Sequence, residues 1–166
     1  MKITTVLLAA CAFAIASPLM AQDPSASDQD FLVKATQANL AEIETGRLAR
    51  QKSGSGEIRA FGEKMVQDHG KTLEQLQALA KARGVELPTA PDEAHQATAF
   101  KLSRASGREF DIMYVKAAGV ADHKLAQQLF EAGARSQDAE ISALAKKALP
   151  DIRHHLEVAQ KLSAAL

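Results

Sequence analysis

Apolar and polar positions follow one another along this chain with the period of amphipathic α-helices. In the segment 56–84, apolar side chains recur at steps of three and four residues until Gly84. The same spacing predicts long helices over 28–53, 108–134 and 138–162, and a short helix over 92–105. Pro150 lies inside the last long run, so we expect either a kink there or two abutting helices.

Short polar breaks between these runs predict how the helices connect. The breaks at 53–56 and 135–137 are short enough to make antiparallel hairpins, whereas the segment 84–107 can cross the end of a bundle. Serines at 27, 55 and 106 are expected to cap the helices that follow them. We predict an all-α fold, namely a ferritin-like four-helix up-down bundle with an extra short helix in the central connection. The long elements follow either a strict up-down-up-down order or a ferritin-like variant of it.

Composition and charge support a helical domain and disfavour several classes of partner. Strong helix formers dominate, and aromatic residues make up only 4% with no Trp, which is poor material for a β-sandwich. The 20 basic and 20 acidic residues are interspersed along helical faces. This balance favours neither nucleic acid nor an anionic membrane surface as a partner.

The first 21 residues have the pattern of a secretory signal peptide. Lys2 precedes a short apolar run, and Ala21 is a small residue before a polar segment, so we expect cleavage after Ala21. The predicted organisation is a signal peptide over 1–21, a linker over 22–27 and the bundle over 28–166, with the mature chain in a bacterial periplasm and no transmembrane span. As an alternative, the run ending at Cys11 resembles a lipobox, which would give a protein lipid-anchored through Cys11.

Each of the four long helices carries one ionisable side chain on its apolar stripe. These residues are Glu42, His69, His123 and His155. An unpaired buried polar group costs about 1–3 kcal/mol, so the four must find partners. One solution is a divalent transition metal, because imidazole and carboxylate suit zinc, iron, copper or manganese. The neighbouring groups that would orient the ligands are Asp68, Asp111, Tyr114 and Asp122. The chain lacks the paired Glu-x-x-His motifs of a di-iron centre at the expected places, so a mononuclear site is expected.

A second solution needs no ligand. The four groups could form a hydrogen-bonded network that fixes helix register in a structural or partner-binding protein. Helical rise places His155 about 7 Å further from its turn than His123, which counts against a common level. We predict no catalytic residues and no organic cofactor. A homo-oligomer or an envelope protein partner is compatible with the long helical surfaces.

Several short runs together resemble a known bacterial family. They are Asn39–Glu42, Lys64–His69, Phe110-Asp111 with Tyr114, Asp122-His123, and Leu149-Pro150 followed by His155-Leu156. The sequence is similar to domain of unknown function 4142, whose members are described as exported or predicted outer-membrane proteins with a ferritin-like bundle. The resemblance implies this fold and an exported location, and it implies no particular reaction.

Overall fold

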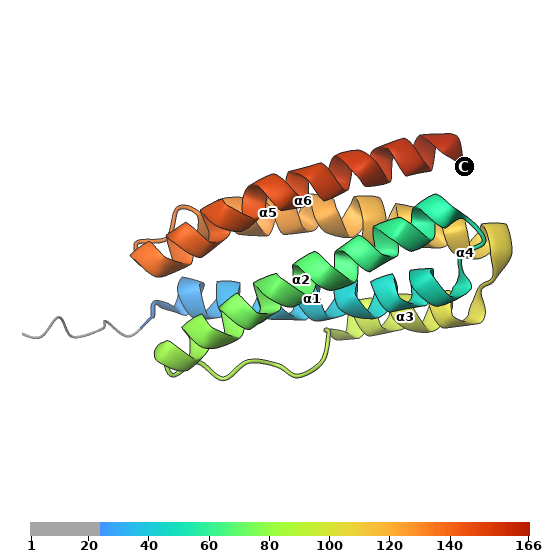
Figure 1. The fold of residues 1–166 in the computed structure, drawn as a ribbon. Helices are drawn as coiled ribbons and strands as arrows, with labels where there is room; N and C mark the ends of the chain where they lie inside the picture. The colour runs from blue at the N-terminus through green and yellow to red at the C-terminus, as the bar shows by residue number, and fades with distance from the viewer. Residues whose placement is uncertain (1–23) are drawn as a thin grey trace, which may run out of the picture.

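The computed structural model describes residues 24–166, and the regular structure in this part of the chain is entirely helical. Its elements are α1 (Ala26–Lys52), α2 (Gly56–Ala82), α3 (Glu93–Arg104), α4 (Gly107–Tyr114), the π-helix η1 (Val115–Asp122), α5 (His123–Gly133) and α6 (Ala139–Ala165) (Figure 1). Because α4, η1 and α5 follow one another without a break, they form the third long element of a four-helix bundle. The predicted ferritin-like all-α bundle with an extra short helix is confirmed. The predicted signal peptide and Cys11 lie outside the described residues.

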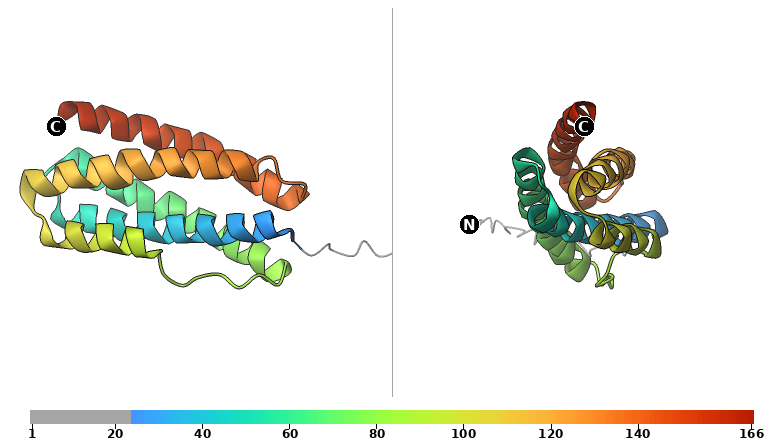
Figure 2. Two further views of the ribbon diagram at one scale, coloured as in Figure 1. Left: turned by 180° about the vertical axis from the view of Figure 1, so that it is seen from behind. Right: turned by 90° about the vertical axis from the view of Figure 1, so that its right-hand side faces the viewer.

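The central connection decides which of the two predicted chain orders is adopted. Helices α1 and α2 are antiparallel across their short turn, as are α5 and α6 (Figure 1). After α2, the chain runs back along the outside of the bundle, and α3 completes this return beside α1 (Figure 2). The third long element therefore runs in the same direction as α2. A single long crossover of this type is the ferritin-like variant, not the strictly alternating order.

The helix starts follow the predicted capping chemistry in part. Ser55 caps α2 as expected, with its Oγ accepting from the N–H of Ile58. At α1 the prediction was wrong by two residues, because Ser25 and not Ser27 is the cap. Asp28, the fourth residue of this capping box, also accepts a hydrogen bond from Ser136 Oγ at 2.5 Å, so a tertiary contact selects this register. The cap predicted at residue 106 is absent, since that side chain makes no capping hydrogen bond.

Two helix interruptions predicted from Gly and Pro have different outcomes. Gly84 follows Arg83, the C-cap of α2, and adopts φ +65°; the next N–H, that of Val85, donates to the Ala80 carbonyl at 2.9 Å. This is a Schellman ending, in which glycine avoids the steric cost of the left-handed conformation. By contrast, α6 continues through Pro150 as one helix, so of the two predicted alternatives, a kink or two abutting helices, the second is wrong.

Small residues let α1 and α2 approach closely. A Cβ atom added to Gly62 would lie 2.7 Å from both the Gly46 carbonyl oxygen and the Ala49 Cβ. The backbones therefore meet at a distance that only glycine permits. Among residues 24–166, no helix combines the length and apolarity that crossing a bilayer requires.

The interior consists of two apolar clusters with a polar layer between them. One cluster is centred on Phe31, Leu76, Phe130 and Ile141, and the other on Phe61, Met65, Phe110 and Tyr114. On each long element, the predicted ionisable residue falls between the positions that serve the two clusters. The polar groups are therefore collected at one level of the bundle and shielded from water at both ends.

Candidate metal centre

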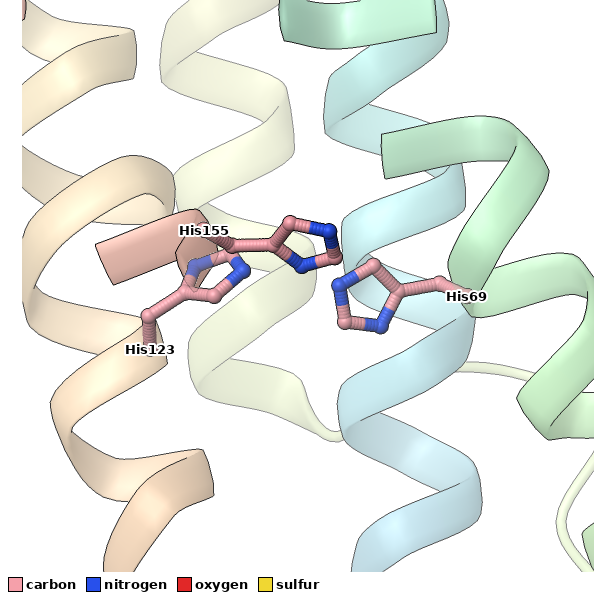
Figure 3. A group of neighbouring side chains, drawn as sticks. All are labelled: His69, His123 and His155. Carbon is pink, nitrogen blue, oxygen red and sulfur yellow. The ribbon is translucent and has the colours of Figure 1, made fainter. Parts of the chain in front are cut away.

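Three of the four predicted ligands meet in this polar layer. His69 comes from α2, His123 is the first residue of α5, and His155 comes from α6 (Figure 3). Their ring centroids are 5.4 to 5.5 Å apart in each pair. Each ring offers one nitrogen that lies within 4.8 Å of a nitrogen of the other two. The three residues are 6%, 0% and 3% exposed, so water does not solvate the rings.

A hydrogen-bonded amide determines where the proton of His69 resides. The Asn39 side-chain nitrogen donates to the Ala35 carbonyl at 2.7 Å, and a carbonyl can only accept. The amide oxygen of Asn39 therefore faces His69, whose Nδ1 lies 2.9 Å away. Since this oxygen is an acceptor, Nδ1 must carry the proton. In a neutral ring, Nε2 is then left with its lone pair.

The other two rings are oriented by the same rule. His123 Nδ1 donates to the Ala118 carbonyl at 3.0 Å, five residues back and inside the π-helix η1. His155 Nε2 donates to Asp68 Oδ2 at 2.9 Å. In both cases an oxygen acceptor lies on the side of the ring that faces away from the other histidines, so the nitrogen on that side carries the proton. The lone pair is therefore on His123 Nε2 and on His155 Nδ1.

The three nitrogens that carry lone pairs have no partner. His69 Nε2, His123 Nε2 and His155 Nδ1 are buried and make no hydrogen bond. They are the nitrogens that face one another across the centre of the bundle (Figure 3). Three acceptors without a donor repel one another and lack solvation, which is costly in a protein interior. An electrophile between them would remove this cost, so the group could hold a metal ion.

The surroundings keep all three imidazoles neutral. Burial lowers the pKa of His69 well below its usual range, and its two histidine neighbours lower it further. Burial also lowers the pKa of His123 to about 4. The pKa of His155 is lowered by burial as well, although Asp68 opposes the shift. Neutral imidazole is the form that binds a metal.

Glu42, the fourth predicted ligand, is placed beside the group of three. Its Oε1 lies 3.4 Å from Nδ1 of His123, the nitrogen that faces away from the other two rings. Both carboxyl oxygens are buried without a hydrogen-bond partner. Burial, assisted by the charge of Asp122, raises the pKa of Glu42 well above its usual range. The Tyr114 hydroxyl is likewise buried and unpartnered, and burial together with Glu42 raises its pKa.

The four predicted orienting residues are distributed over the bundle. Asp68 accepts the hydrogen bond from His155 Nε2. Asp122 lies near Glu42 and 3.9 Å from His95 Nε2. Tyr114 belongs to the apolar cluster beside the layer. Asp111 instead accepts a hydrogen bond from Ser53 at the α1–α2 turn, which secures that end of the bundle and not an imidazole.

Side-chain direction explains why His123 and His155 meet despite the expected difference in height. In a helix, each Cα–Cβ bond tilts toward the N-terminus. Because α5 and α6 are antiparallel, His123 leans away from their shared turn whereas His155 leans toward it. The two rings therefore approach to 5.4 Å between centroids, although helical rise alone separated the backbones by about 7 Å.

Three features of the site were not assigned from the sequence. Asn39 was noted as part of the run Asn39–Glu42 and had no role, and a polar residue one turn before Glu42 was the available signal. His95 of α3, which borders the layer, had no role either. The π-helix η1 immediately before His123 has no signature in the periodicity. Such segments are rare and frequently occur at functional sites.

Comparisons with known proteins agree with this architecture. A crystal structure of a DUF305 fragment from Deinococcus radiodurans superposes with a TM-score of 0.76 at 13% identity, covering 87% of this chain and all of that one. CopM in the Cu(II)-bound form superposes with a TM-score of 0.70 at 14% identity, covering 83% of this chain and 96% of that one. At such identities the likeness shows the fold alone. No curated protein sequence matches. The model of the domain of unknown function DUF4142 matches residues 15–162, and the chain therefore belongs to this family.

Proposed function

We propose that this protein binds a single transition-metal ion through His69 Nε2, His123 Nε2 and His155 Nδ1. One observation carries the proposal, namely that three buried, neutral imidazoles direct unpartnered lone pairs at one another. Metal-bound histidines characteristically donate their other ring nitrogen to a carbonyl or carboxylate, which sets the tautomer and the ring orientation. All three rings have such an oxygen acceptor on the outer side.

Copper and zinc are the ions that suit this donor set best. Three imidazoles form a nitrogen site of intermediate softness, and affinity at such sites rises along the first transition row to Cu²⁺. Zinc is also held by three histidines with one open position. Metal–nitrogen bonds of about 2.0–2.1 Å place two ligand nitrogens of a tetrahedral site about 3.4 Å apart. The three nitrogens lie within 4.8 Å of one another, so each pair must approach by up to about 1.4 Å when a metal binds. The structural likeness to CopM, whose title describes a Cu(II)-bound form, favours testing copper first.

Glu42 supplies charge compensation in this proposal. A divalent ion among three neutral ligands leaves a buried positive charge that no ligand offsets. Glu42 Oε1 lies next to His123 Nδ1, where an ionised carboxylate would stabilise the ion through the imidazole. A proton is therefore expected to leave the protein when the metal binds.

Calorimetric titration of the chelator-treated chain with Cu²⁺ and with Zn²⁺ tests the proposal. We expect one ion per chain, and His69→Ala and His123→Ala should each weaken binding by more than about 100-fold, beyond what orienting residues contribute. His154→Ala is the matched control, because His154 adjoins His155 yet is exposed. The single tyrosine, Tyr114, gives an independent signal, since the chain has no Trp and Cu²⁺ quenches nearby fluorescence.

The alternative, a network that only fixes helix register, makes the opposite prediction. The wild-type chain would bind no copper or zinc at micromolar concentration, while the same histidine substitutions would still lower the melting temperature. That combination of results would refute the metal proposal.

We further propose that the protein works in the bacterial envelope after export. The support is the signal-peptide pattern over residues 1–21. The N-terminus of the protein purified from the periplasm should be Gln22. An acylated Cys11 would instead establish the lipid-anchored alternative.

A further inference from the structure

A cavity adjoins two of the three histidines, His69 and His155, and extends to partly exposed polar groups. Glu42, His69 and His155 line its inner part, each of them more than nine-tenths buried. His95 of α3 and Asp122 of η1 also line it, and their side chains are each 22% exposed. The cavity therefore joins groups that water reaches to the unpartnered atoms of the interior, and it has room for a water molecule.

His95 and Asp122 present two electron-rich groups to the same space. Asp92 caps α3 and its carboxylate accepts the Nδ1 proton of His95 at 2.5 Å, which holds the ring in place. His95 Nε2 is thereby directed at Asp122 Oδ2, 3.9 Å away. This separation is too long for a hydrogen bond. It exceeds the spacing of two ligands in a tetrahedral site by about 0.5 Å, so a small approach of the two side chains would let one cation bind both.

Glu42 continues this path toward the interior. Its two oxygens are buried and unpartnered, it lines the same cavity, and Asp122 is close enough to raise its pKa. Its Oε1 in turn lies 3.4 Å from His123. Imidazole and carboxylate groups thus succeed one another from the partly exposed edge to the candidate metal centre.

We propose that His95 and Asp122 form an outer cation station through which the metal ion enters the three-histidine site. This inference rests on the proposed metal-binding function and adds the route and the role of α3. The ion is held briefly between His95 Nε2 and Asp122, passes Glu42, and reaches the three imidazoles. The short helix α3, which packs Ala99 and Leu102 into the core, thereby acquires a second role as the element that carries His95.

The opposite border of the cavity offers a competing route. Asp68 and Asp151 line it there, on α2 and α6. Lys64 lies 2.8 Å from Asp68, and Lys71 lies 4.0 Å from it, so two positive charges stand close to that border. Asp122 makes no lysine or arginine ion pair among the described residues, so no fixed positive charge competes with an incoming cation for its carboxylate.

Stopped-flow mixing of the full chain with Cu²⁺, followed by Tyr114 quenching, distinguishes the two routes. Asp122→Asn and His95→Gln should each lower the association rate constant by about 10-fold, within the usual range of electrostatic steering. The equilibrium Kd should change by less than about threefold, because a transient station lowers the barrier in both directions. Asp151→Asn removes the same charge from the same cavity and should leave the rate unchanged.

Four results would overturn the inference. Slower association in Asp151→Asn but not in Asp122→Asn would assign the entrance to the α2–α6 side. A tenfold weaker Kd with an unchanged association rate in Asp122→Asn would place Asp122 in the site itself. Normal binding and rates in all variants would remove the station and leave the three-histidine site intact. A wild-type chain that does not bind copper would remove both proposals.

Discussion

The neutral state of His123 predicts how the stability of the metal-free protein depends on pH. Burial lowers the pKa of this imidazole to about 4 in the folded chain, whereas an unfolded chain titrates near 6.5. Between these values the unfolded state binds more protons. Stability is therefore complete above about pH 6.5 and falls as pH decreases toward 4.

The magnitude follows from the width of that window. Each pH unit below about 6.5 costs about 1.4 kcal/mol for one such group, so His123 alone should remove about 2 kcal/mol between pH 7 and pH 5. The raised pKa of Glu42 has the opposite sign over part of this range, because the folded state then binds more protons. A comparison of matched variants separates the two contributions.

The assay is urea unfolding at pH 7 and pH 5 in the presence of a chelator. His123→Asn retains a side-chain N–H for the Ala118 carbonyl but does not titrate, so its stability should fall by about 2 kcal/mol less than that of wild type. Any packing cost of the shorter side chain is present at both pH values and cancels. His154→Asn, at an exposed position, should behave as wild type does. Equal losses in wild type and His123→Asn would refute a buried neutral His123.

Further predictions concern packing, ligand orientation and the buried acid. Gly62→Ala should lower the free energy of unfolding by about 1–3 kcal/mol in urea, because its Cβ would meet the backbone of α1. Gly70→Ala, with open space at the Cβ position, should leave the free energy of unfolding unchanged or raise it by up to about 1 kcal/mol. A similar loss of stability in Gly62→Ala and Gly70→Ala would contradict the close approach of α1 and α2. Asn39→Leu should weaken copper binding by about 10–100-fold in a chelator competition, because His69 loses the group that sets its tautomer; an unchanged Kd would exclude that role. Relative to wild type, Glu42→Gln should raise the melting temperature more at pH 8 than at pH 4. The reason is that wild-type stability is lost as pH rises from about 4.5 through the raised pKa of Glu42. A larger increase at pH 4 than at pH 8 would contradict a neutral buried acid.

The amphipathic period and the turns were sufficient to predict the helices and the layer of ionisable groups. A side chain such as His69 on an apolar stripe must enter the interior wherever that stripe is buried, so burial of the four groups follows from local spacing. The glycine at 84 and the serine at 55 determine nearby helix ends through interactions within a few residues, and these were also predictable.

The structure differed from the prediction, or chose between its alternatives, where a contact between distant segments determines the conformation. The choice of Ser25 as the N-cap of α1 depends on the contact of Asp28 with Ser136, more than a hundred residues away. The parallel direction of α2 and the third long element depends on the path of the crossover, because the length of a connection does not specify which end of the bundle it reaches.

The sequence by itself thus determined the helices, their buried faces and the presence of three histidines and one glutamate in the core. Only the tertiary structure decided which nitrogens face one another, because this depends on hydrogen bonds to Asn39, the Ala118 carbonyl and Asp68, which the helical period does not specify. It also brought His123 and His155 to one level through the opposite lean of side chains on antiparallel helices. Helical period is a local property of the chain, whereas the direction of a lone pair depends on partners that only packing brings together.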